Sequence, residues 1–319
     1  MSPCQPASGW RSAPRRRLAA LRRHVSRPAE PAAGTTSDPA AAAGTTSDLR
    51  CTALSLVFGV RIGGLDTSRP LGRGTVDVLK GLMARHKLLL LPGGRLSVAQ
   101  LAAFGTSLDL GDAQQFGATQ IASYMSTCSE DDRVQMVEYG PDTAPADINI
   151  WHQDHSWHRN PTEFELSYID QSPEVGGSVI YADAAAAYKS LSPRMQQLLR
   201  GCTYAASLAN GYQNLDLLSD EYRRTIQEHP PIEQPVVTYD EDSGERMLNI
   251  NEAYTMRIMQ ISKAESAALL PMLFAHIAKG EHCLRLQYEQ GDICIFDNHK
   301  LQCVPAKSSL AVFGVACPC

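Results

Sequence analysis

The chain has 319 residues, of which 44% are hydrophobic, and a formal net charge of −5, so it can form one large folded domain with a tail. No apolar run approaches the roughly 18 residues of a membrane-spanning helix. A net positive charge is confined to residues 1–29 and the rest of the chain is acidic, which argues against nucleic-acid binding. The nine cysteines show no C-x-x-C spacing, which excludes a zinc ribbon and a disulfide framework.

The first fifty residues differ in composition from the rest. Residues 1–29 hold seven Arg and no Asp, Glu or Lys. Such a leader is typical of an organelle transit peptide, and a disordered basic tail is the alternative. Residues 31–50 contain the sequence AAGTTSD twice, ten residues apart, which predicts a low-complexity linker. We therefore expect residues 1–50 to be disordered and residues 51–319 to fold, in the cytoplasm or, with a transit peptide, in a mitochondrion or plastid.

Short apolar segments alternate with a few helical patterns along the folded part. Helices are predicted by apolar residues at helical spacing and by a Ser three residues before a Gln or Glu, which forms a capping box. Ser192 followed by Pro193 predicts the start of a further helix. These helices cover residues 76–86, 97–108, 192–200 and 262–279. Strands are predicted over residues 54–62, 87–91, 164–169, 178–181, 236–239, 246–250, 283–288 and 292–296, with a hairpin turn at 240–244. Many short strands with a few covering helices predict a mainly β fold of the jelly-roll class, with flanking helices.

The segment His152-Gln153-Asp154 is the strongest candidate for chemistry. On an extended strand, residues i and i+2 point to the same face, so the imidazole and the carboxylate would converge. They would form two thirds of the 2-His-1-carboxylate triad of non-haem iron enzymes. A surface His beside a solvated Asp is the alternative. His152, His155 and His158 also have helical spacing, which leaves a helical zinc site open, although the strand pattern here favours the first interpretation.

Several motifs follow this pair in a fixed order. They are GGSVIYAD at 176–183, AAYKSLS at 186–192, LNINE at 248–252, SKAES at 262–266 and GDICIFDN at 291–298. Together they resemble the taurine dioxygenase family over roughly residues 52–303. The resemblance implies a double-stranded β-helix (jelly roll), Fe(II) and 2-oxoglutarate as cofactor and cosubstrate, O₂, and a small anionic substrate such as taurine or another sulfonate or carboxylate. It implies no nucleic-acid or membrane partner and leaves a homo-oligomer open.

The chain departs from the family pattern at its C-terminal end. The position of the family's second His is Cys303, and His299 lies near it in sequence. If the strand is extended, residues 299 and 303 face the same side. The Thr that the family places beside the cosubstrate carboxylate corresponds to Val179, and no Arg follows Arg285, which leaves Lys307 as the last cation. We expect an atypical end over residues 304–319.

Substrate contacts are the least determined part of the site. Asn149 precedes the metal pair, and Tyr212 could form an aromatic wall, or be an ordinary core or surface residue. Two functions remain open: a dioxygenase impaired by the changes at the C-terminal end, or a catalytically inactive family member that serves as a binding or regulatory protein.

Overall fold

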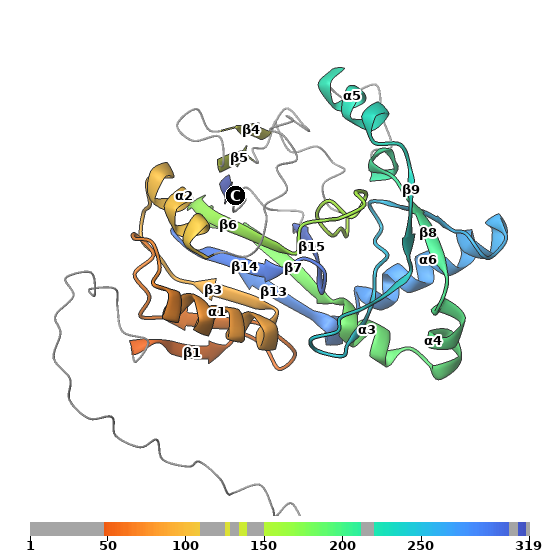
Figure 1. Cartoon of the computed structure of the whole chain (residues 1–319), viewed down its shortest axis with the longest axis horizontal. Coiled ribbons are helices and arrows are strands. Elements are labelled where there is room, and N and C mark those ends of the chain that lie inside the picture. The colour runs from red at the N-terminus through yellow and green to blue at the C-terminus, as the bar shows by residue number, and fades with distance from the viewer. Residues whose placement is uncertain are drawn as a thin grey trace, which may run out of the picture. The chain divides into compact units, whose positions relative to one another are not determined.

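A computed structural model of the chain describes residues 48–108, 125–127, 134–138, 150–211, 220–305 and 312–316 (Figure 1). The α-helices are α1 (Arg73–His86), α2 (Val98–Ser107), α3 (Ala184–Ser190), α4 (Pro193–Leu199), α5 (Asp220–Glu228) and α6 (Lys263–Ile277). The strands are β1 (Arg50–Ala53), β2 (Val60–Gly63), β3 (Leu88–Leu91), β4 (Met125–Thr127), β5 (Val134–Glu138), β6 (Phe164–Gln171), β7 (Ser178–Asp183), β8 (Thr203–Ala206), β9 (Ile232–Pro235), β10 (Val237–Tyr239), β11 (Arg246–Leu248), β12 (Thr255–Ile258), β13 (Cys283–Gln287), β14 (Ile293–Asp297), β15 (Leu301–Pro305) and β16 (Val312–Ala316).

The large sheet has eight strands in the order β1-β2-β3-β14-β6-β16-β5-β4. Its central strands β3 and β14 are buried along their whole length, because each face of the sheet covers a different core. Leu88 and Leu90 lie in the core on one face, and Leu89 and Leu91 lie in the core on the other. This explains why the sequence shows an unbroken run of four leucines instead of an alternating pattern.

One core lies between the large sheet and a three-stranded sheet in the order β13-β7-β15. Residues of β3, β14, β7, β13 and β15 meet there, among them Phe296, Tyr181, Leu286 and Cys303. The other core separates the large sheet from helices α1 and α2, which cover its outer face. Two largely antiparallel sheets, with one parallel pair between β2 and β3, face each other across an apolar interior with helices outside, and form the predicted jelly roll.

A third core lies behind β7, where Ala182 faces α6 and the sheet β12-β8-β9. The GG motif of the sequence has a structural role at the start of β7. Gly176 and Gly177 have φ values of 93° and 69°, which side-chain-bearing residues rarely adopt, so this pair sets the turn that leads into the strand.

The starts of three of the four predicted helices agree with the structure, whereas α1 begins at Arg73, three residues before its predicted start. Ser97 and Gln100 form a capping box at α2, as Ser262 and Glu265 do at α6. Ser192 caps α4, with Pro193 in its first turn. The hairpin of β10 and β11 and the strands β3, β6, β7, β13 and β14 also lie where the patterns placed them.

The predicted strand over residues 54–62 is confirmed only at residues 60–62, which belong to β2, and is wrong over residues 54–59. The Ser55 hydroxyl accepts hydrogen bonds from the amides of Val57 and Phe58, and Gly59 has φ of 88°, so the segment turns back on itself. The turn joins β1 to β2, and β1 begins at Arg50, one residue before the expected domain start. A hydroxyl that bonds its own backbone in this way competes with strand pairing.

The C-terminal end contributes to the large sheet. Strand β16 lies between β5 and β6 and pairs with both in antiparallel register. The segment expected to be atypical therefore supplies a strand inside the sheet. The leader and linker up to residue 47 lie outside the described residues. Among the described helices, none has the length and apolarity that crossing a bilayer requires.

Candidate metal centre

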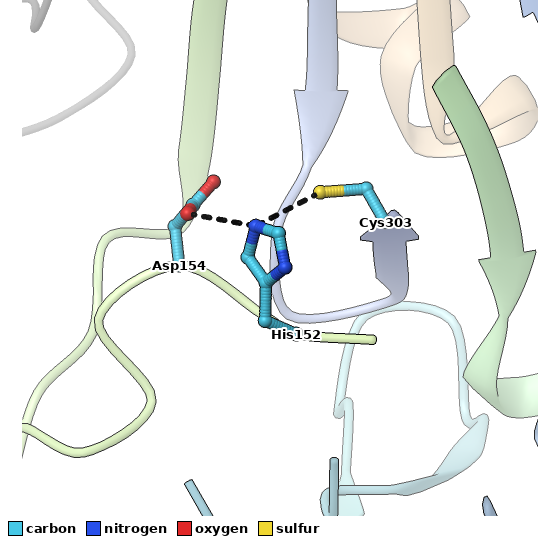
Figure 2. Close-up of side chains that lie close together, drawn as sticks. All are labelled: His152, Asp154 and Cys303. Atoms are coloured by element: carbon cyan, nitrogen blue, oxygen red, sulfur yellow. Dashed lines mark hydrogen bonds and ion pairs between the residues drawn. The ribbon is translucent and has the colours of Figure 1, made fainter. Parts of the chain in front are cut away.

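Three side chains converge where the segment that carries His152 and Asp154 meets β15 (Figure 2). His152 Nε2 lies 3.6 Å from Asp154 Oδ1 and 3.6 Å from Cys303 Sγ. All three atoms lie within 4.8 Å of one another, and no other group of three or more potential metal-ligating side chains meets this condition among the described residues. The two residues of the H-x-D pair thus meet the residue that stands where the family has its second His.

Backbone pairing holds two of these residues together. His152 and Cys303 form an isolated antiparallel bridge, in which the His152 amide donates to the Cys303 carbonyl (3.1 Å) and the Cys303 amide donates to the His152 carbonyl (2.9 Å). On the other side of β15, Cys303 pairs with Tyr181 of β7. The Cys303 backbone is therefore fixed from both sides, and its side chain shares a face with those of its two partners.

The backbone conformation that positions Asp154 differs from the predicted one. It lies in a turn and not on a strand with His152, and the next residue, His155, has φ of 56°. The side chains converge as expected, but a turn brings them together. A left-handed backbone at a residue other than Gly is uncommon and is found disproportionately at functional sites.

Asn298 and Gln153 hold this turn in place. Asn298 is 1% exposed; its Oδ1 accepts from the Asp154 amide (2.9 Å), and its Nδ2 donates to the carbonyls of Asp154 and Thr162 (both 2.8 Å). Gln153 Nε2 donates to the carbonyls of Asn298 (3.0 Å) and His299 (3.1 Å). The sequence motifs contain Asn298 in the D-N dipeptide and Gln153 between the two candidate ligands, but they gave neither residue a role, because the spacing of amide side chains does not indicate what they bond.

The protonation of His152 suits metal binding, whereas that of Cys303 opposes it. His152 Nδ1 lies 2.9 Å from the Ile150 carbonyl, which can only accept a hydrogen bond, so the ring proton belongs on Nδ1 and the Nε2 lone pair faces Asp154 and Cys303. Burial, together with the charges of Asp154 and Glu165, raises the pKa of the Cys303 thiol well above its usual value. A metal ion that binds sulfur there must displace a proton.

The other histidines near the pair are not part of the cluster. His155 Nδ1 lies 3.7 Å from Glu165 Oε1; burial alone lowers the pKa of His155, but the hydrogen bond and charge of Glu165 outweigh it and hold the pKa above its ordinary value. His158 packs edge-on against Trp157. No helix runs through this segment, so the helical zinc site is wrong.

His299 is not positioned to replace the missing ligand. It lies in the turn between β14 and β15, is exposed, and its Nε2 lies 3.3 Å from the Pro161 carbonyl. Residues 299 and 303 therefore do not share one extended strand, as the sequence argument had assumed. Val179, by contrast, lies on β7 two residues from Tyr181 and belongs to the same interior core as Cys303. Asn149, Tyr212 and Lys307 lie outside the described residues.

The donor set fits a single divalent ion. Bonds of about 2.1 Å to nitrogen or oxygen and about 2.3 Å to sulfur place the donors of one ion about 3.0–3.6 Å apart, depending on the coordination angle. The two separations of 3.6 Å lie at the upper end of that range. His152, Asp154 and Cys303 could thus hold the ion after small side-chain movements, with the remaining positions open to small ligands.

The fold and the cluster define a jelly-roll protein with three potential metal ligands gathered beside β15. Residues 50–303 match the family described as taurine catabolism dioxygenase TauD, TfdA family. The match covers most of the chain, so the chain belongs to this family. By family it is an Fe(II)- and 2-oxoglutarate-dependent dioxygenase, and the predicted cofactors are confirmed at that level.

Individual relatives agree with this assignment. The alpha-ketoglutarate-dependent sulfate ester dioxygenase of Pseudomonas putida is 25% identical over 253 residues, which are 77% of this chain and 80% of that protein. The alpha-ketoglutarate-dependent 2,4-dichlorophenoxyacetate dioxygenase of Cupriavidus pinatubonensis is also 25% identical, over 76% of this chain and 86% of that protein. Other curated relatives, including two from Penicillium expansum, are matched over 36–52% of their own length.

Solved structures confirm the fold. AAD-2, crystallised with Mn(II) and N-oxalylglycine, superposes with a TM-score of 0.66 at 20% identity, over 85% of this chain and 96% of that one. A putative alpha-ketoglutarate-dependent taurine dioxygenase from Burkholderia xenovorans gives 0.67 at 18% identity, over 84% and 91%. At these identities the similarity shows the jelly-roll architecture alone.

Proposed function

We propose that this chain is a dioxygenase that hydroxylates a small anionic substrate, taurine or another sulfonate or carboxylate, with impaired activity. The observation that carries the proposal is the convergence of His152, Asp154 and Cys303 within 4.8 Å in a chain of this family. The named activities of the sulfate ester and 2,4-dichlorophenoxyacetate relatives support an anionic substrate. With Fe(II) and 2-oxoglutarate bound, the centre would supply O₂ activation, and one turnover would yield hydroxylated substrate, succinate and CO₂.

The residues of this chain position the reactants and limit access of water. The Ile150 carbonyl keeps the proton of His152 on Nδ1, and Asn298 fixes the backbone of Asp154. The Cys303 side is closed by the apolar interior, where Val179, Tyr181 and Phe296 are each at most 8% exposed. Asp154, with 35% of its side chain exposed, lies on the open side, so we place substrate entry there.

The impairment has two structural grounds. Cys303 replaces a neutral nitrogen ligand by sulfur, and Val179 offers no hydroxyl to a cosubstrate carboxylate. The described residues also offer no free buried cation in compensation. Lys87 is held by Asp183 and Glu245, and the other buried lysine, residue 300, is held by two aspartates.

The sheet register indicates where a cosubstrate-binding Arg could be restored. Position 315 of β16 pairs with Ser167 of β6, and Ser167 pairs in turn with Cys294, which lies in the interior core. An Arg introduced at position 315 would therefore pair across the strands with a residue whose own partner lies in the interior core. Position 314 pairs instead with Tyr168, whose side chain lies in the outer core.

The test compares four forms of the full chain: wild type, Cys303→His, Val315→Arg and the double variant. Each is incubated with Fe(II), 2-oxoglutarate, O₂ and a panel of sulfonates and carboxylates, and succinate is measured. We expect little release from wild type and the highest release from the double variant, because a charge-assisted bidentate contact contributes roughly 1.5–3 kcal/mol, or about ten- to a hundred-fold in affinity.

Two outcomes would change the proposal. If wild type already releases succinate as fast as the double variant, the site is not impaired and Cys303 is a competent iron ligand. If no form releases succinate while Asp154→Ala lowers metal affinity, the second candidate function is favoured. That candidate is a metal-binding protein of this family with a binding or regulatory role, and the engagement of both buried lysines by carboxylates is the observation that supports it.

A further inference from the structure

The proposed metal centre has a sulfur donor, Cys303, where the family has a second histidine. A nitrogen, an oxygen and a sulfur atom lie within 4.8 Å of one another. The backbones of His152 and Cys303 are paired, and the Asn298 side chain holds the backbone of Asp154. Cys303 is 8% exposed and paired on both sides, so its sulfur has little freedom to turn away from His152. We propose that Cys303 converts the iron position of this family into a site that selects Zn(II) over Fe(II).

The first argument is the chemical softness of the ligands. Thiolate is a soft donor that favours Zn(II), Cu(I) and iron–sulfur clusters, whereas carboxylate and imidazole donors together suit Fe(II). The carboxylate of Asp154 is a hard donor, which disfavours Cu(I) and suits Zn(II). Zinc sites with three protein ligands and one open position are built from the same donor types: nitrogen, sulfur and carboxylate oxygen.

The second argument is the spacing of the donor atoms. With bonds of about 2.1 and 2.3 Å, a nitrogen and a sulfur on one ion lie about 3.1 Å apart at the right angle of an octahedral site and about 3.6 Å apart at a tetrahedral angle. The observed distance from His152 Nε2 to Cys303 Sγ is 3.6 Å. The distance from the same nitrogen to Asp154 Oδ1 is also 3.6 Å, again nearer the tetrahedral value. Both distances from His152 Nε2 are therefore nearer to those of a tetrahedral site, the geometry that zinc prefers, than to those of an octahedral one.

The inference has a direct consequence for activity. Zn(II) has no redox chemistry and cannot activate O₂. A zinc-loaded chain would be inert as an oxygenase, and activity would depend on how much Fe(II) competes for the site. The inference rests on the metal centre of the proposed function, but it does not require that any oxygenation occurs.

The test measures metal preference without measuring turnover. Metal-free full-length protein is titrated anaerobically with Zn(II) and with Fe(II) against a chromophoric chelator, and the ratio of the two dissociation constants is compared between wild type, Cys303→His and Cys303→Ser. Cys51→Ser, at an exposed cysteine in β1, is the matched control. Thermal melts of the metal-free proteins establish that each variant folds. We expect the preference for Zn(II) to fall on the order of tenfold or more in both Cys303 variants and to stay unchanged in the control.

A spectroscopic measurement tests the sulfur ligand itself. Co(II) added to metal-free wild type should give a sulfur-to-cobalt charge-transfer band that the Cys51→Ser control retains and both Cys303 variants lack. Absence of this band in wild type, or a Zn(II) preference equal to that of Cys303→His, would overturn the inference and leave the dioxygenase proposal standing. If wild type binds neither Zn(II) nor Fe(II), the metal centre is wrong and both proposals fail.

Discussion

Asn298→Ala should destabilise this protein more than its position in a turn suggests. The side chain makes three hydrogen bonds of 2.8–2.9 Å, two to the backbone of Asp154 and one to the carbonyl of Thr162, and it is 1% exposed. Each buried hydrogen bond contributes about 1 kcal/mol, and an abandoned partner costs about 1–3 kcal/mol. A water molecule entering the vacated space would recover part of this loss. The expected decrease in the free energy of unfolding is therefore about 2–4 kcal/mol.

Urea unfolding of metal-free protein, followed by far-UV circular dichroism, measures this change. Asn160→Ala is the matched control, because it removes the same atoms from an exposed residue of the loop that Asn298 contacts. Substitutions at such surface positions usually change stability by less than about 0.5 kcal/mol. Asn298→Asp keeps the acceptor for the Asp154 amide but loses both donors, so it should be at least as damaging as Asn298→Ala. Co(II) affinity should fall in both Asn298 variants, because Asp154 is no longer held. A stability loss for Asn298→Ala equal to that of the control would refute the reasoning.

Three further predictions concern elements away from the metal centre. Asp240 is partly buried, which opposes ionisation, but hydrogen bonds from Lys300 and Ser243 and the charge of Lys300 lower its pKa to about 2; Asp240→Asn should cost about 1–2 kcal/mol at pH 7 in urea unfolding, and the difference from wild type should shrink below about pH 4 and vanish near pH 2. Ser262→Ala removes the cap of α6 and should cost about 1 kcal/mol, seen as a lower melting temperature. Burial lowers the pKa of His276. The contribution of His276 to the free energy of unfolding is therefore highest above the ordinary histidine pKa and decreases as pH falls through the lower pKa of the folded state. An NMR titration that gave His276 a pKa above the ordinary value would contradict this.

The helices and strands that were predicted correctly are those determined by residues close to one another in the sequence. A capping box or a Pro in the first turn acts within four residues, so the starts of α2, α4 and α6 could be read directly. The continuous apolar run of β3 also predicted a buried strand correctly, because both faces of that strand are buried. The segment 54–59 was misjudged because its apolar composition fits a strand, while the hydroxyl of Ser55 and the left-handed Gly59 turn the backbone.

The metal site was predicted only in part, because some of its contacts join residues that are far apart in the sequence. The H-x-D spacing identified His152 and Asp154, but the strand assumed to align them does not extend to Asp154. Their approach to Cys303 depends on pairing between segments 151 residues apart, which periodicity cannot reveal. The motif order of the family supplied that long-range information. It did not supply the clamp by Gln153 and Asn298, because buried amides have no spacing signature.

The structure separates what holds the metal centre together from what determines its chemistry. The bridge between His152 and Cys303 uses only main-chain atoms, and the clamp on Asp154 is made by Asn298, so neither depends on which side chain residue 303 carries. Loss of the family's second His therefore leaves the position of the third donor intact while changing its element from nitrogen to sulfur. A scaffold of this kind can change its metal preference through one substitution without refolding, and the same independence is why Cys303→His is expected to restore a nitrogen donor at that position.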